Sequence, residues 1–285
     1  MGLNEIQKKC LEAYKEFKRI CDKHDLNYFA IGGTCIGAVR HNGFIPWDDD
    51  IDIAMPINDL FEFLKISENE LDKSYSIYSP KNTKYFMGNF YKLHNINTAF
   101  IEKGNVKYPE SYKGIGIDIM PMYGMPKGEK KQLRMAKTND LFLSFNQKNR
   151  LPFSDQKSLS SKLKWVLPYP IYKKNNWNYW LEKSIHKYAA IPFNQSDKIL
   201  FAWRRFPHKR MKTNYKSIFA YEDFSSWCDM RFEDTYIRVP VGWDSYLTRD
   251  FGNYMELPPE EKRVSVHNYL IIDTKHSYKE YIGKL

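Results

Sequence analysis

The chain has 285 residues, of which 42% are hydrophobic and 27% charged. This composition excludes a disordered chain and supplies a sizeable core, built either as one large domain or as a catalytic core with a helical extension. The formal charge of +10 favours polyanionic partners such as nucleotides, phosphate-bearing polymers, nucleic acid or an anionic membrane surface, although a lysine-rich solvated surface explains it equally well.

Cysteine spacing and hydropathy set the expected location. No apolar run reaches the roughly eighteen residues that span a bilayer, and the first residues lack the basic-then-apolar order of a signal peptide. We therefore expect a soluble or peripheral protein in the cytoplasm. Neither a zinc site nor a disulfide framework is predicted, because the cysteines are widely spaced without a CxxC or Cys/His cluster. They are Cys10, Cys21, Cys35 and Cys228.

The N-terminal part of the chain predicts a phosphate site. Apolar residues at helical spacing indicate a helix over 3–24, followed by a strand over 27–31, a glycine turn and a short helix over 34–41. Because Gly32 and Gly33 have no Cβ, the backbone there can approach a ligand closely. Thr34 can cap the following helix, whose N-terminus favours an anion.

Alternating carboxylates follow directly. Residues of equal parity share one face of a strand, so Asp50 and Asp52 project together while Ile51 and Ile53 point into the core. Adjacent carboxylates repel each other unless a divalent cation lies between them, and Mg²⁺ favours carboxylates together with substrate phosphate. The pair therefore indicates phosphoryl or nucleotidyl chemistry. The neighbouring Trp47 is interpreted first as a core anchor, with stacking on a base or a quaternary ammonium as the alternative.

A third carboxylate lies further along the chain. Before it, Asn58 is predicted to cap a helix over 59–70. Asp118 is flanked by isoleucines in the run from Gly114 to Pro121. A bare charge in such surroundings is costly to bury, so Asp118 is either hydrogen-bonded in the core or shares a cation.

Aromatic and β-branched runs predict strands over 75–79, 85–94 and 98–102.

The second half of the chain is predicted to begin with helices. A stretch over 162–174 mixes cations with Trp and Tyr, which favours packing between helices and leaves an interfacial membrane segment as the alternative. A basic cluster within 198–212 either meets acceptor phosphates or is solvated. The predicted helices cover 127–150, 159–167 and 176–190.

Two stretches of the sequence resemble the LicD family, to which fukutin-type phosphotransferases are related. The first runs from Gly32 to Ile53 and reads GGT, GAVRH and GFIPWDDDIDI. The second reads VPVGWDSYL, FGNYM and LPP and continues to His267. At 251–253 this chain has Phe-Gly-Asn where Tyr-Gly-Asp is more usual, which removes an acidic residue. The matches cover about residues 25–123 and 236–267.

The resemblance implies an α+β fold with a nucleotidyltransferase-like mixed sheet, flanking helices and a mainly helical insertion and C-terminal part. It divides the chain into a catalytic core over 1–125, a mainly helical acceptor-side region over 126–235, and a C-terminal segment over 236–285 that packs back on the core. It also favours a site role for Asp118 as the third carboxylate over a structural one.

The resemblance also implies residue roles. Asp50, Asp52 and Asp118 are expected to bind Mg²⁺ or Mn²⁺, and either Asp48 or a metal-bound carboxylate to accept the proton of the acceptor hydroxyl. The donor phosphates are assigned to Gly32, Gly33, Thr34 and Arg40, and further substrate contacts to Trp47, Arg263 and His267. Arg263 and His267 are equally well explained as two solvent-exposed residues one helical turn apart with no contact to substrate.

By resemblance, the donor is CDP-choline or a related CDP-alcohol, and the acceptor is a sugar of teichoic acid, lipopolysaccharide or capsule. A lipid-linked acceptor would bring peripheral contact with the inner face of the cell membrane. The alternatives are a nucleotidyltransferase that uses NTP and releases pyrophosphate, and a non-catalytic polyanion-binding protein, against which the intact carboxylates argue. Nucleic acid, suggested only by charge and aromatic content, is not an expected partner.

Overall fold

The computed structural model describes residues 3–79, 90–106, 108–149, 158–166, 189–202, 204, 217–265 and 269–285. The helices in these ranges are α1 (Glu5–Lys23), α2 (Gly32–His41), α3 (Ile57–Glu70), α4 (Glu129–Asn149), α5 (Leu159–Val166) and α8 (Trp243–Phe251). The strands are β1 (Phe29–Ala30), β2 (Asp52–Pro56), β3 (Tyr75–Tyr78), β4 (Tyr91–Asn95), β5 (Ala99–Glu102), β6 (Gly116–Gly124), β7 (Lys198–Phe201), β8 (Ile218–Ala220), β9 (Trp227–Phe232), β10 (Thr235–Pro240) and β11 (Tyr269–Asp273).

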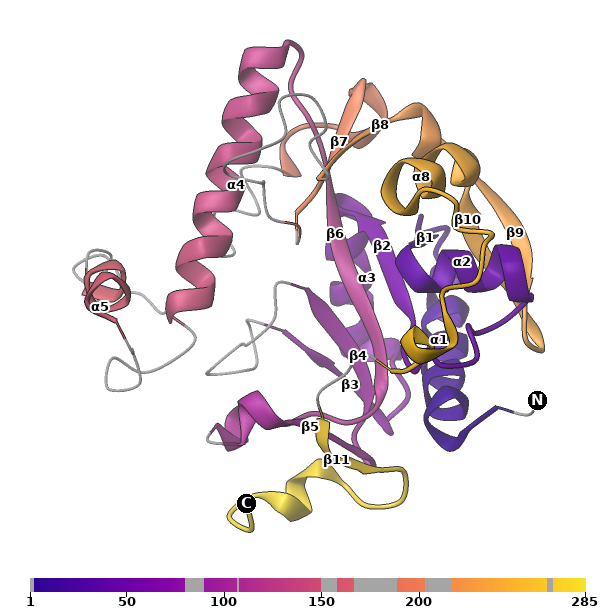
Figure 1. Ribbon diagram of the computed structural model, residues 1–285, viewed down its shortest axis with the longest axis vertical. Helices are drawn as coiled ribbons and strands as arrows, with labels where there is room; N and C mark the ends of the chain where they lie inside the picture. The colour runs from indigo at the N-terminus through magenta and orange to yellow at the C-terminus, as the bar shows by residue number, and fades with distance from the viewer. Residues whose placement is uncertain are drawn as a thin grey trace.

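A twisted mixed sheet forms the centre of the molecule (Figure 1). Within the described residues it has seven strands in the order β1-β2-β6-β4-β3, and β7 and β8 extend it from the C-terminal end of β6. Strands β2 and β6 are parallel, whereas the other neighbours in the sheet are antiparallel. The mixed α+β class predicted from the sequence is confirmed.

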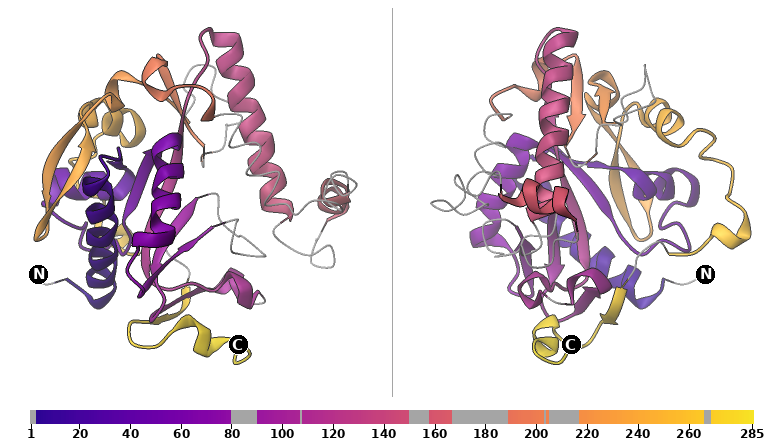
Figure 2. Two further views of the ribbon diagram at one scale, coloured as in Figure 1. Left: turned by 180° about the vertical axis from the view of Figure 1, so that it is seen from behind. Right: turned by 60° about the vertical axis from the view of Figure 1, so that its left-hand side comes forward.

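Helices α1 and α3 lie side by side against one face of the sheet (Figure 2). Helix α1 starts with a capping box, in which Asn4 and Gln7 accept from each other's backbone amides. The contact between the helices includes the buried rings of Phe17 and Phe63, whose centroids are 4.9 Å apart. This packing holds the N-terminal helix against β4 and β6, the strands that carry part of the site.

Most predicted elements are confirmed with shifted ends. The strand predicted over 85–94 corresponds to β4, and residues 80–89 lie outside the described part of the chain, as do most of 176–190 and of the basic cluster after residue 204. The other confirmed helices and strands are those predicted over 3–24, 27–31, 34–41, 59–70, 75–79, 98–102, 127–150 and 159–167.

Two local predictions are wrong. No separate glycine turn precedes α2, because Gly32 is already its first residue and adopts the left-handed φ of +57° that glycine tolerates. Asn58 does not cap α3 either. That helix starts at Ile57, directly after Pro56, whose fixed φ suits a helix start without a side-chain cap.

The described part of the region over 126–235 contains strands as well as helices. Its first half contains α4 and α5, but its second half contributes β7 and β8 to the central sheet and β9 to a two-stranded ribbon with β10. Their apolar residues were not recognised as strands because each run is only three to six residues long. The sheet therefore continues beyond the segment predicted as the catalytic core.

Buried His94 gives the fold a predicted pH dependence. Its Nδ1 accepts the backbone N–H of Gly114 at 3.0 Å, and burial, followed by the charges of Lys92 and Lys113, lowers its pKa from 6.5 to about 3. Between these pH values the unfolded chain binds a proton that the folded protein does not. Stability is therefore full above about pH 6.5 and is lost as the pH falls, by about 1.4 kcal/mol per unit.

His94→Asn retains an acceptor near the Nδ1 position but does not titrate in this range. Chemical denaturation of both proteins at several values between pH 4 and 7.5 tests the assignment. The slope of unfolding free energy against pH should be shallower in the variant by up to about one proton. Parallel curves would contradict a neutral His94 in the folded protein.

Candidate active site

Parallel pairing of β2 with β6 creates the centre of the site. Asp52 and Asp118, which are far apart in sequence, are direct neighbours in this register. The backbone N–H of Asp118 donates to the carbonyl oxygen of Ile51 at 2.9 Å, which fixes the two strands at this point. Asp50 lies in the loop that leads into β2, so the three predicted carboxylates converge on one end of the strand pair.

The start of α2 closes one side of this carboxylate cluster, which consists of Asp48, Asp50, Asp52 and Asp118. A Cβ at Gly33 would overlap a carboxylate oxygen of Asp48, so glycine permits the close approach. The Thr34 hydroxyl accepts the backbone N–H of Asp52 at 2.8 Å. The prediction that Thr34 caps the helix is wrong, because Ile31 holds the N-cap position and the hydroxyl is bonded to β2 instead.

Like charges in the cluster act on one another. Burial, followed by the carboxylates of Asp50 and Asp118, raises the pKa of Asp52 well above its ordinary value. Burial also raises the pKa of Asp118, and the ammonium group of Lys92 opposes that change. The cluster therefore has an excess of negative charge that a further cation would reduce.

Lys92 is part of this site and was not predicted from the sequence. Its Nζ lies 2.6 Å from Oδ1 of Asp118, and the two side chains are only 8% and 13% exposed. In the sequence, Lys92 is a single lysine within a stretch rich in aromatic residues, and it belongs to no recognisable motif. Its importance follows from the antiparallel register of β4 with β6, which puts Lys92 directly opposite Asp118.

A cavity of about 110 Å³ adjoins the cluster. Asp50, Asp118 and Lys92 form part of its wall, and Phe100 supplies an apolar surface. A second, partly buried cation, Lys113, also lines it and pairs with Glu102 at 3.0 Å. The cavity thus combines apolar walls with charges of both signs next to the carboxylates.

The C-terminal segment contributes Tyr246 to the site. Its buried hydroxyl accepts the backbone N–H of Gly32 at 2.9 Å, so that amide is already bonded. The ring packs among aromatic residues from the second half of the chain. Tyr246 therefore fixes the start of α2. Local sequence does not predict this role, because Tyr246 lies more than 200 residues from Gly32 in the chain.

Other predicted substrate residues connect the core to the C-terminal segment. Arg40 donates to the backbone oxygens of Tyr254 and Glu256. Trp47 packs against the hydrophobic core, as its first interpretation predicted, and the guanidinium of Arg263 lies 5.8 Å from its ring centroid. His267 lies outside the described residues.

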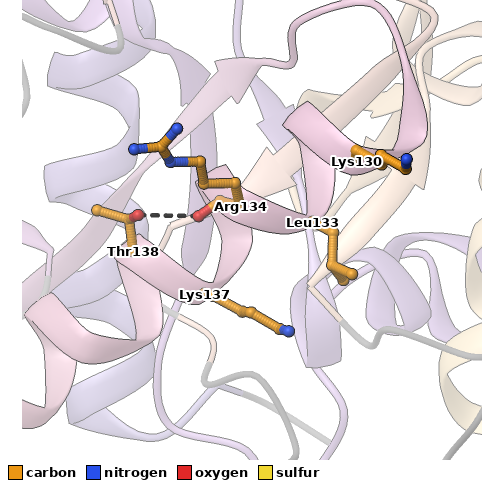
Figure 3. Close-up of a pocket in the computed structure, with 5 residues that line it drawn as sticks. All are labelled: Lys130, Leu133, Arg134, Lys137 and Thr138. Atoms are coloured by element: carbon orange, nitrogen blue, oxygen red, sulfur yellow. Dashed lines mark hydrogen bonds between the residues drawn. The ribbon is translucent and has the colours of Figure 1, made fainter.

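A separate basic surface lies along α4 (Figure 3). It forms an open cavity of about 440 Å³ lined by Lys130, Leu133, Arg134, Lys137 and Thr138. All five residues come from one helix, and the Thr138 hydroxyl donates to the carbonyl oxygen of Arg134 at 2.8 Å. This surface does not include any residue of the carboxylate cluster.

None of the described helices is both long and apolar enough to cross a bilayer.

The carboxylate cluster suits a hard divalent cation, because it offers oxygen ligands and carries an excess of negative charge. Among the described residues, however, no three His, Cys, Asp or Glu side chains already stand as a ready set of ligands. Asp118 is engaged by Lys92 instead. A metal ion shared by Asp50, Asp52 and Asp118 would therefore require these side chains to reorient.

Comparison with known proteins gives a family match for the N-terminal part of the chain. The LicD/FKTN/FKRP family, described by its nucleotidyltransferase domain, matches residues 25–161. The chain carries a LicD-family domain. It is also 28% identical over 280 residues to the lipopolysaccharide cholinephosphotransferase LicD of Haemophilus influenzae, which covers 94% of this chain and 96% of that protein.

Shorter similarities connect the chain to uncharacterized proteins of Rickettsia typhi and Rickettsia prowazekii. They are 40% and 43% identical over 63 and 51 residues, covering 21% and 17% of this chain and 20% and 19% of theirs. The predicted LicD-type phosphotransferase is thus confirmed at the level of the family. The LicD-family domain includes the carboxylate cluster and Lys92, whereas Tyr246 and Arg263 lie beyond it.

Proposed function

We propose that the protein transfers phosphocholine, or a related phospho-alcohol, from a CDP-alcohol to a sugar of a cell-surface glycan and releases CMP. The observation that carries this proposal is the similarity along 94% of the chain to a lipopolysaccharide cholinephosphotransferase. CDP-choline is the proposed donor, and teichoic acid, lipopolysaccharide and capsule are the candidate acceptors. A lipid-linked acceptor would bring the protein to the inner face of the membrane.

The chemistry requires charge neutralisation and a proton acceptor. Asp50, Asp52 and Asp118 would hold Mg²⁺ or Mn²⁺, which supplies positive charge next to the donor pyrophosphate when bound. Asp48 or another carboxylate of the cluster would take the proton from the attacking sugar hydroxyl. The half-buried position of these groups supports both roles, because electrostatic effects are larger where water is partly excluded.

The start of α2 is the proposed site for the donor phosphates. The first residues of the helix lie beside the carboxylate cluster, and helix N-termini favour anions. Because the N–H of Gly32 is bonded to Tyr246, we assign the phosphate contacts chiefly to Gly33 and Thr34. Arg40 would reach the donor only by leaving its two carbonyl acceptors in the C-terminal segment.

Nucleotidyl transfer is the second candidate, favoured by the description of the matched domain. The same carboxylates would then act on an NTP, the acceptor would gain a nucleoside monophosphate, and pyrophosphate would leave. The two reactions share a metal requirement and differ in their products. Product analysis therefore separates them.

CMP release tests the proposed function. CDP-choline, CDP-glycerol and CDP-ribitol are each incubated with the protein and a glycan acceptor, with and without Mg²⁺ or Mn²⁺. We expect metal-dependent release, fastest from CDP-choline, that is lost in Asp50→Asn and Asp118→Asn and retained in the exposed control Asp229→Asn. Pyrophosphate from CTP or ATP without CMP release from any CDP-alcohol would favour nucleotidyl transfer instead.

A further inference from the structure

We propose that Lys92 is a built-in counter-cation of the carboxylate cluster, which stabilises the metal-free protein and competes with a divalent ion for Asp118. Lys92 would thereby set the metal affinity of the site. This inference rests on the proposed function, because it concerns the cation that the phosphotransferase would use. It assigns Lys92 as a positioning residue, since its described contacts are with protein side chains.

The position of Lys92 is unusual for a lysine. All five residues of β4 are buried, and Lys92 is one of them. Its Nζ contacts Oδ1 of Asp118 at 2.6 Å and lies 5.7 Å from the ring centroid of Phe100. Lysine is almost never fully buried without a partner, so the burial of this side chain is explained by the carboxylate.

The register of the sheet makes this pairing specific. Lys92 is directly opposite Asp118 in the antiparallel β4–β6 pair, and Asp118 is directly beside Asp52 in the parallel β6–β2 pair. The three residues therefore form one row across three neighbouring strands. Moving Lys92 away from the cluster would require its side chain to turn into the adjoining cavity, which it already lines.

Competition with a metal ion follows from this geometry. The ammonium group and a divalent ion would both interact with the Asp118 carboxylate, and their positive charges repel each other at short range. Removing the ammonium charge leaves the cluster more negative and should strengthen metal binding. In the absence of metal, the same change leaves Asp118 buried without its cation, which destabilises the protein.

The test compares Lys92→Met, Asp118→Asn and the double variant with the wild-type protein. Thermal unfolding is measured in EDTA, and Mn²⁺ binding is measured by titration calorimetry. Lys65→Met is the matched control, because Lys65 also pairs with a carboxylate, that of Glu62, but lies exposed on α3. If Lys92→Met fails to fold, Lys92→Gln keeps a polar contact with Asp118 without the charge and replaces it in both measurements.

We expect Lys92→Met to lower the metal-free Tm by roughly 10 °C and the double variant to recover most of that loss. The Kd for Mn²⁺ should fall about tenfold or more in Lys92→Met, and neither quantity should change in Lys65→Met. A loss of Tm that the double variant does not recover, or an unchanged or weaker Mn²⁺ affinity, would overturn the inference.

These readouts distinguish this inference from the proposed function. Mn²⁺ binding that responds to Lys92→Met, without CMP release from any CDP-alcohol, would support the counter-cation and reject the proposed reaction. CMP release together with a Mn²⁺ affinity that is unchanged in Lys92→Met would support the proposed reaction and reject the counter-cation. An absence of Mn²⁺ binding in both wild type and Lys92→Met would reject the competition.

Discussion

Asp52→Asn is expected to abolish turnover while making the metal-free protein more stable. The substitution removes a proposed metal ligand, so activity should fall on the order of a thousandfold or more. It also removes a carboxyl whose pKa burial and like charges hold well above the ordinary value. Loss of function together with a gain in stability is typical of a residue that is strained for catalysis.

The sign of the stability change follows from proton linkage. Because the folded pKa of Asp52 is raised, the folded protein retains a proton that the unfolded chain releases above about pH 3.9. Asp52 therefore destabilises the fold increasingly as pH rises through this window, and asparagine does not. The gain in Tm should be larger at pH 8 than at pH 5.

Three measurements check the Asp52 prediction: CMP release, Tm in EDTA at several pH values, and the Tm change on adding Mg²⁺. Mg²⁺ should stabilise the wild-type protein and have little effect on the variant, because a ligand stabilises only the state that binds it. The same substitution at the exposed Asp229 is the control and should change none of the three. A stable variant that retains wild-type turnover would exclude Asp52 from the reaction.

Gly116→Ala is expected to cause a large loss of stability through a single added methyl group. A Cβ at this position of β6 would overlap the carbonyl oxygen of Leu93 and lie 2.6 Å from Cα of His94. Because both neighbours are backbone atoms of β4, relief requires the two strands to separate. We expect a cost of about 3 kcal/mol, which lowers the Tm by roughly 10 °C.

Turnover should fall as well, since Asp118 is two residues further along β6 and depends on the same strand pairing for its contact with Lys92. Gly104→Ala is the matched control, because a Cβ at Gly104 has no heavy atom within 4 Å. Thermal unfolding and CMP release of both variants test the prediction. Equal Tm values for Gly116→Ala and the wild-type protein would show that β4 and β6 need not approach so closely.

Local sequence was sufficient for the carboxylates and for most helices and strands. The alternating carboxylates Asp50 and Asp52 and the helical periodicity of α1 are visible without tertiary contacts, although only Asp52 lies within β2 and Asp50 lies in the loop before it. The LicD resemblance was recognisable for the same reason, because its first motif is contiguous. Where a helix end depends on backbone geometry, as at Gly32 and Pro56, local patterns placed the boundary wrongly by two residues.

Tertiary structure alone decided what surrounds the carboxylates. Lys92 meets Asp118 through strand register, and Tyr246 meets Gly32 through the packing of α8, so neither partner has a signal in its own sequence neighbourhood. The physical reason is that periodicity reports which face a residue occupies, whereas register and packing between distant segments select the residue it contacts. The sequence by itself therefore indicated the LicD resemblance and the acidic chemistry. The fold determined that the ammonium group of Lys92 pairs with Asp118 and that the hydroxyl of Tyr246 binds the amide of Gly32.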